Sequence, residues 1–170
     1  MARYAAQGGK FNIDVALDGA DVLVKVTGAS AHGSRPEEGV NPLPRLALFL
    51  QQSGVTLAVN GYAQAVKYIA DLYGVDYLGR TMGLAYSDDF MGPLTMSPNL
   101  VREKDGKVDV LVNVRMPRGN TPEALSQATP ARVKAWGAQA GVAVEVDHPQ
   151  GNWMARDPKG AWLSTLLNTF

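Results

Sequence analysis

Apolar and polar residues alternate along three stretches of the chain, which is the pattern of a β-strand. In residues 11–27 the alternation is interrupted by Asp18-Gly19, so a hairpin is predicted there. Residues 94–116 predict two further strands around Lys104-Asp105-Gly106, and residues 142–146 predict a last strand. A shift of one residue in the pairing register of a strand would move every side chain to the opposite face of the sheet. The valines at 108, 110, 112 and 114 should therefore face helices, which leaves Arg115 on the open face.

Helical spacing of apolar residues predicts four helical segments. The first begins at Asn41-Pro42, where an N-cap is followed by proline at the first helical position, and the second covers roughly residues 62–72. The third begins at Thr121-Pro122 and ends at Gly141. Pro130 lies inside it and predicts a kink or a restart. The fourth covers residues 158–170; either this apolar helix docks on the domain or its partner has been cut away, and we favour truncation.

The order of these elements predicts an α+β fold. We expect a two-layer sandwich with a four-stranded antiparallel sheet and helices on one face. This is a ferredoxin-like βαββαβ arrangement, with an extra helical insertion near residues 58–92.

Composition excludes several classes of function. The 170 residues carry 16 Lys and Arg against 16 Asp and Glu, which argues against nucleic acid as the main partner. There is no cysteine, so a disulfide scaffold and a thiolate metal site are excluded. No apolar run is long enough to predict a membrane span. With only two histidines, we expect no metal site within the chain itself. The compartment stays open between cytoplasm and periplasm.

Three polar residues are the main candidates for chemistry. His32 follows a strand in a Gly- and Ser-rich loop, where it can face a ligand or simply be an exposed loop residue. Arg115 offers a planar fork for a carboxylate, or forms an ordinary surface salt bridge. Asn99 follows Ser97-Pro98 and is typical of a turn.

In combination, these residues resemble a known family. The segment TGASAHGSRPEEGVN, residues 27–41, is similar to the histidine motif in the lid domain of the aminoacylase/glutamate carboxypeptidase/dipeptidase V metallopeptidase family. Residues 83–95, then Asn99, then VNVRMP at 112–117 are similar to the dipeptidase branch of that family. The resemblance covers nearly all of residues 10–170.

The resemblance implies a lid domain whose zinc-binding catalytic domain is absent from this chain. Residues 1–10 would be a linker from that domain, residues 11–150 the lid, and residues 151–170 a linker with the start of a catalytic-domain helix. His32 would stabilise the oxyanion formed during peptide hydrolysis. Arg115 would bind the terminal carboxylate of the dipeptide, and Asn99 would add a polar contact. A lid–lid dimer is possible in this family, although the enlarged lid makes a monomer plausible.

We therefore expect a lid domain of a zinc dipeptidase that is inactive alone. Its partners would be the missing catalytic domain and the dipeptide substrate. The alternative is a free-standing module that binds a protein or a carboxylate and has no catalytic role. Coding sequence on either side of the chain would separate the two.

Overall fold

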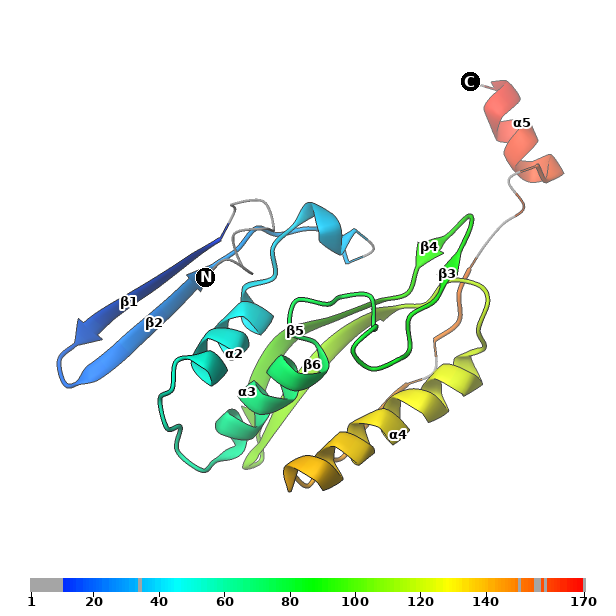
Figure 1. Ribbon diagram of the computed structural model, residues 1–170. Helices are drawn as coiled ribbons and strands as arrows, with labels where there is room; N and C mark the ends of the chain where they lie inside the picture. Colours follow the sequence, from blue (N-terminus) through cyan, green and yellow to red (C-terminus); the bar gives the residue numbers. More distant parts are fainter. Residues whose placement is uncertain (1–10, 34, 150, 155–156, 158, 170) are drawn as a thin grey trace.

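The computed structural model describes residues 11–33, 35–149, 151–154, 157 and 159–169. The predicted linker at residues 1–10 lies outside these ranges. Figure 1 shows the elements in chain order. They are β1 (Asn12–Asp18), β2 (Asp21–Thr27), the 3-10 helix η1 (Pro36–Glu38), α2 (Pro42–Gln52), α3 (Gly61–Leu72), β3 (Ser87–Asp88), β4 (Gly92–Pro93), β5 (Thr95–Lys104), β6 (Lys107–Arg115), α4 (Pro122–Ala140) and α5 (Ala161–Thr169). The α+β class is confirmed.

The strands form three separate two-stranded antiparallel sheets, β1–β2, β3–β4 and β5–β6. The predicted four-stranded, ferredoxin-like sheet is not formed by the described residues. The hairpin at 11–27 is present as predicted, with Gly19 at a φ of 63° in its turn. However, its second strand contacts α2 and does not pair with β5 or β6. The alternating pattern predicts extended backbone, but it does not specify the strand that pairs with it.

The predicted last strand at residues 142–146 is wrong. This segment has no strand assignment, and its valines are half-buried. It returns along α4, because the Val142 N–H donates to the Gly137 carbonyl (2.8 Å). Lys107 at the start of β6 reaches it through a 2.9 Å ion pair with Glu145. The alternation therefore marks one side of an extended segment packed on a helix.

Local signals place the helix ends well. The Asn41 side chain accepts a hydrogen bond from the Leu43 N–H (3.0 Å) at the start of α2. Thr121 caps α4 through the Ala124 N–H (3.1 Å), and Gly141 ends α4 in the left-handed conformation. The expected restart at Pro130 is wrong, since α4 continues through it from Pro122 to Ala140. Helix packing outweighs the hydrogen bond that proline removes.

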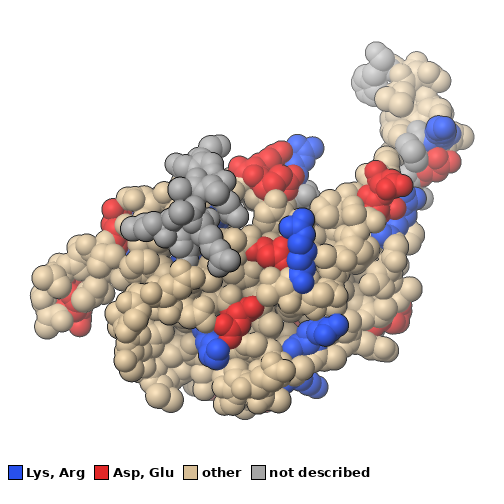
Figure 2. All heavy atoms as spheres, in the orientation of Figure 1, with Lys and Arg blue, Asp and Glu red and all other residues tan. Residues whose placement is uncertain are grey.

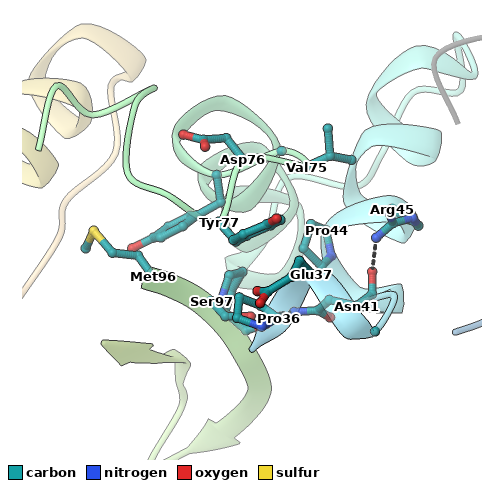
Figure 3. Close-up of a pocket in the computed structure, with 14 residues that line it drawn as sticks. Pro36, Glu37, Asn41, Pro44, Arg45, Val75, Asp76, Tyr77, Met96 and Ser97 are labelled. Atoms are coloured by element: carbon teal, nitrogen blue, oxygen red, sulfur yellow. Dashed lines mark hydrogen bonds between the residues drawn. The ribbon is translucent and has the colours of Figure 1, made fainter. Parts of the chain in front are cut away.

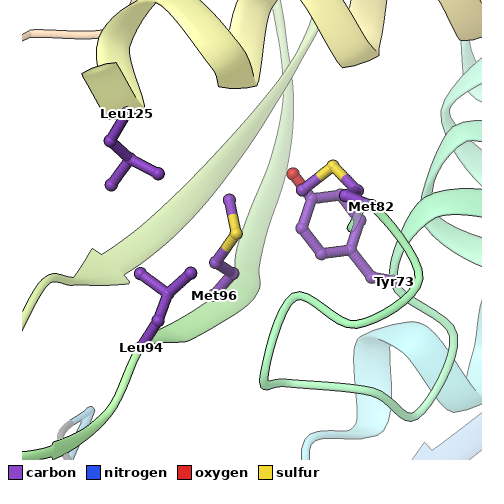
Figure 4. Packing of buried hydrophobic residues seen from close by; sticks show 5 residues of the cluster. All are labelled: Tyr73, Met82, Leu94, Met96 and Leu125. Atoms are coloured by element: carbon purple, nitrogen blue, oxygen red, sulfur yellow. The ribbon is translucent and has the colours of Figure 1, made fainter. Parts of the chain in front are cut away.

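The core lies between the β5–β6 sheet and helices α2, α3 and α4. One cluster joins Tyr73, Met82, Leu94, Met96 and Leu125, with Val112 and Val114 packed against it (Figure 4). A second cluster joins α2 and α3 through Ala47, Ile69 and Ala70, with Val110 against it. Val108 lies against Gly61 at the start of α3. The predicted register of β6 is therefore confirmed.

The C-terminal helix α5 stands away from the sheet and the other helices (Figure 1). Trp162 and Leu167 on its apolar stripe are each 70% exposed. Within the part of the chain that the structure describes, no helix has both the length and the apolar character needed to cross a bilayer.

Candidate functional site

The histidine motif lies in a loop that is closed at its base. Ala29 and Val40 form an isolated antiparallel bridge, with N–H to carbonyl distances of 3.0 and 2.8 Å. Glycine is required at this closure. A Cβ on Gly28 would lie 2.1 Å from the Val40 carbonyl oxygen, and a Cβ on Gly39 would lie 2.6 Å from the Ala31 Cβ. The motif therefore specifies a closed loop as well as the histidine it carries.

Side chains of the motif and of β5 tie this loop to the sheet. The Thr95 hydroxyl donates to the Gly33 carbonyl (3.3 Å). The Asn41 Nδ2 donates to the Ser97 hydroxyl (3.0 Å) and to the Pro98 carbonyl (2.8 Å). Asn41 thus caps α2 with its oxygen and anchors the loop with its nitrogen.

The loop brings the His32–Gly33 turn over one end of the β5–β6 sheet. Thr95 pairs with Arg115 and Ser97 pairs with Asn113, so these four side chains share a face. A Cβ on Gly33 would lie 3.2 Å from the Asn113 Oδ1 and 3.6 Å from the Arg115 Nε. Residues about 80 positions apart in sequence therefore meet at this corner.

His32 itself is exposed at the turn. Its carbonyl accepts a hydrogen bond from the Arg35 N–H (2.8 Å), and Arg35 forms a 3.1 Å ion pair with Glu38 in η1. Local contacts therefore hold the backbone of the turn and leave the imidazole at the surface.

Arg115 is exposed on the open face, as the register predicts. Three other arginines pair with carboxylates: Arg35 with Glu38, Arg102 with Asp109 and Arg118 with Asp88. Arg115 has no such ion pair with any described carboxylate. The ordinary surface salt bridge considered above is therefore not formed among the described residues.

Asn99 does not lie beside the other two candidates. It is exposed and forms a β-bulge, because Pro98 pairs with Val112 while Leu100 pairs with Leu111. It follows Thr95 by four residues, which is roughly 13 Å along a strand. Any contact between a ligand and both Asn99 and Arg115 would span that distance.

Three polar residues beneath the loop were not predicted as part of the site. Thr95 is 4% exposed, Ser97 is half-buried, and the Asn113 Oδ1 is buried with no hydrogen-bond partner among the described residues. The alternation of Thr95 and Ser97 with Leu94 and Met96 could have placed them on the face of Arg115. The alternation could not show that the loop carrying His32 covers these residues.

A cavity of about 340 Å³ lies beside the same loop, between η1, the start of α2 and the turn after α3 (Figure 3). Glu37 and Tyr77 line it. Burial, followed by the charge of Glu37, raises the pKa of Tyr77. The carboxylate of Asp76 is already used by the N–H groups of Leu78 (3.0 Å) and Thr81 (2.9 Å). The residues lining this cavity do not include His32, Asn113 or Arg115.

Charge and metal-ligating groups are dispersed. Figure 2 shows acidic and basic side chains interspersed on the visible face, with no large patch of one sign. Among the described residues, no group of three or more His, Asp or Glu is arranged to hold a metal ion. The planar guanidinium of Arg115 presents N–H donors of the kind that pair with a carboxylate.

No family model matches the chain. A β-Ala-Xaa dipeptidase of Lactobacillus delbrueckii subsp. lactis is 33% identical over 124 residues, which cover 68% of this chain and 25% of that protein. The putative dipeptidase YtjP of Bacillus subtilis (strain 168) is 28% identical over 105 residues, covering 61% of this chain and 22% of that protein. The chain is thus related to proteins named as dipeptidases, and it spans about a quarter of their length.

Proposed function

We propose that this chain is the substrate-binding lid of a dipeptidase and contributes side chains to an active site that it completes with other parts of a longer polypeptide. The names of its two relatives support the reaction class, and their coverage supports a partial contribution. In this proposal residues 11–150 form the lid, and residues 1–10 and 151–170 connect it to the catalytic part.

The observation that carries the proposal is the meeting of the His32–Gly33 turn with the Arg115 end of β6. An exposed imidazole and an arginine without an ion pair to any described carboxylate lie at one corner of the sheet. A dipeptide presents complementary groups, because its terminal carboxylate is separated from the scissile carbonyl by one residue.

Each residue then has a distinct role. Arg115 binds the terminal carboxylate through two N–H groups of its planar fork. His32 donates an N–H to the carbonyl oxygen as negative charge develops there. Asn99 contacts a more distant part of the substrate. The described residues do not fit a zinc site, so in this proposal any zinc would be held by the catalytic part of the longer polypeptide.

Steady-state kinetics on the protein encoded by the complete reading frame would test these roles. His32→Ala should lower kcat by about 100- to 1000-fold, because the oxyanion exists only near the transition state. Arg115→Ala should mainly raise KM, because the carboxylate is present in both ground and transition states. The control Leu111→Ala changes the same face of β6 and should alter neither constant.

A change of kcat within twofold for His32→Ala would exclude the oxyanion role. If the complete protein binds dipeptides but never hydrolyses them, the free-standing carboxylate-binding module becomes the better description.

A further inference from the structure

Asn113 is the polar residue closest to the corner that has no assigned role. Its Oδ1 is buried and accepts no hydrogen bond from any residue in the part of the chain that the structure describes. Asn113 lies two residues before Arg115 in β6, so both side chains leave the same face of the strand. An amide acceptor without a donor in such a place is unusual, because buried polar atoms are nearly always paired.

The Arg115 Nε–H is a donor close to this oxygen. A Cβ on Gly33 would touch both the Asn113 Oδ1 (3.2 Å) and the Arg115 Nε (3.6 Å), so the two atoms flank the same side of Gly33. Glycine has only a hydrogen in that position. A rotation of the exposed Arg115 side chain can therefore bring its Nε–H toward the amide oxygen.

The chemistry of guanidinium explains why such a contact would matter. Arginine carries five N–H donors in one plane, and an end-on carboxylate uses one from each terminal nitrogen. An acceptor on the Nε–H then fixes the plane of the fork and its direction. Without such an acceptor, the arginine side chain would become ordered only when the ligand binds. The entropy lost in that ordering would weaken the affinity.

We propose that Asn113 is the positioning residue of Arg115: its Oδ1 accepts the Arg115 Nε–H when a ligand carboxylate occupies the two terminal nitrogens. Gly33 keeps the space between them open. The inference rests on the proposed function, since it presumes that Arg115 binds a carboxylate. It adds that the affinity for the carboxylate depends on Asn113 and Gly33 as well as on Arg115.

The test uses the full 170-residue chain, labelled with ¹⁵N, and N-acetylglycine as the carboxylate probe. The Arg115 Nε–H signal is assigned by its loss in Arg115→Gln. On titration of the wild-type chain, this proton should shift downfield and exchange more slowly with water, as expected for a new hydrogen bond.

Asn113→Leu keeps a similar volume and removes the acceptor. It should weaken binding of N-acetylglycine by about threefold to tenfold, the range expected for one hydrogen bond. The slowed exchange should also disappear. Leu111→Ala on the same face should behave as wild type. Asn113→Asp retains an acceptor and should slow exchange of the Arg115 Nε–H even without the probe.

Gly33→Ala provides an independent variant that leaves Asn113 intact. Its methyl group would enter the space between the amide and the guanidinium, so it should reproduce the effect of Asn113→Leu on the Nε–H signal. This variant decides the question if Asn113→Leu fails to fold.

The outcomes separate the two proposals. If Arg115→Gln binds N-acetylglycine as well as wild type does, or if neither binds it, the carboxylate-binding role proposed for Arg115 is wrong and the inference falls with it. If Arg115→Gln abolishes binding while Asn113→Leu and Gly33→Ala keep wild-type affinity and exchange, only the positioning role is wrong.

Discussion

The two faces of the β5–β6 sheet are built by the same strands but do different work. On one face, Val110, Val112 and Val114 are packed under α2, α3 and α4. On the other face, Arg115 and Leu111 are exposed, and the His32 loop crosses the end of the sheet. We call these the valine face and the loop face.

The difference shows how stability and binding are divided within one element. Apolar burial on the valine face removes side chains from water and supplies most of the driving force for folding. The loop face contains polar groups such as the Asn113 Oδ1, which has no hydrogen-bond partner within the ranges that the structure describes. A residue on this strand pair therefore contributes mainly to stability or mainly to binding according to the face it occupies, and four measurements can test that division.

The largest expected effect is on the valine face. Leu94 is fully buried, so Leu94→Ala should lower the free energy of unfolding by about 2–5 kcal/mol through lost burial and a cavity. Leu100 is 46% exposed on the loop face, and Leu100→Ala should cost less than about 1 kcal/mol. Urea unfolding would measure both. Equal losses for the two leucines would contradict the division.

The second effect is at the base of the loop. Gly28→Ala would place a Cβ 2.1 Å from the Val40 carbonyl oxygen, which the backbone cannot accept without opening the bridge. The free energy of unfolding should fall by about 1–3 kcal/mol. Hydrogen exchange at the amides of Ala29 and Val40 should accelerate.

Gly151→Ala is the matched control, because a Cβ there meets nothing within 4 Å. Unchanged exchange at Val40 in Gly28→Ala would show that the loop is not held by this bridge.

The third effect should change binding alone. Arg115→Lys keeps the charge and loses the planar fork, so affinity for N-acetylglycine should fall about tenfold, equivalent to one charge-assisted hydrogen bond. Unfolding should change by less than about 0.5 kcal/mol. Arg102→Lys, in an exposed pair with Asp109 on the same face, is the control. Calorimetric titration would measure the affinities. Wild-type affinity of the lysine variant for N-acetylglycine would argue against bidentate binding.

The smallest expected effect is on the pH dependence of the free energy of unfolding, and it arises from α3, which packs on the valine face. Asp71 of α3 accepts hydrogen bonds from Lys67 (2.7 Å), Trp136 (2.9 Å) and Gln51 (2.7 Å). Burial would raise the pKa of Asp71, but these hydrogen bonds outweigh it and lower the pKa. A lowered pKa in the folded state stabilises the protein above the unfolded pKa of about 3.9, and this stabilisation is lost as the pH falls through the folded value.

Asp71→Asn should therefore lower the free energy of unfolding by about 1 kcal/mol at pH 7. Between about pH 5 and pH 2, within about two units of the unfolded pKa, the free energy of unfolding of the variant should change less with pH than that of the wild type. A wild-type profile for Asp71→Asn would show that the three hydrogen bonds contribute nothing net.

Much of the local structure could be predicted because its causes are local. The Asn41 cap, the Gly141 stop and the turn at Asp18-Gly19 depend on backbone groups within a few residues. The register of β6 also follows from alternation, because a slip by one residue would expose four valines and bury Asn113 and Arg115.

Local patterns did not predict which strands pair with one another or which surface packs against a given segment. The alternation at residues 142–146 correctly marks an apolar side, but the segment packs on α4 and joins no sheet. Pro130 is a local helix breaker, and packing of α4 overrides it. In both cases the outcome depends on which distant surface is available.

The sequence by itself determined the β1–β2 hairpin, β5, β6, the four α-helices, the faces of β6 and the presence of His32 in a loop and Arg115 on a strand. The tertiary structure decided that the loop closes at Ala29 and Val40, crosses β5 and brings Gly33 onto Asn113 and Arg115. The physical reason is range. Capping and alternation act over a few residues, whereas a site made of segments about 80 residues apart exists only after long-range hydrogen bonds and core packing have joined them.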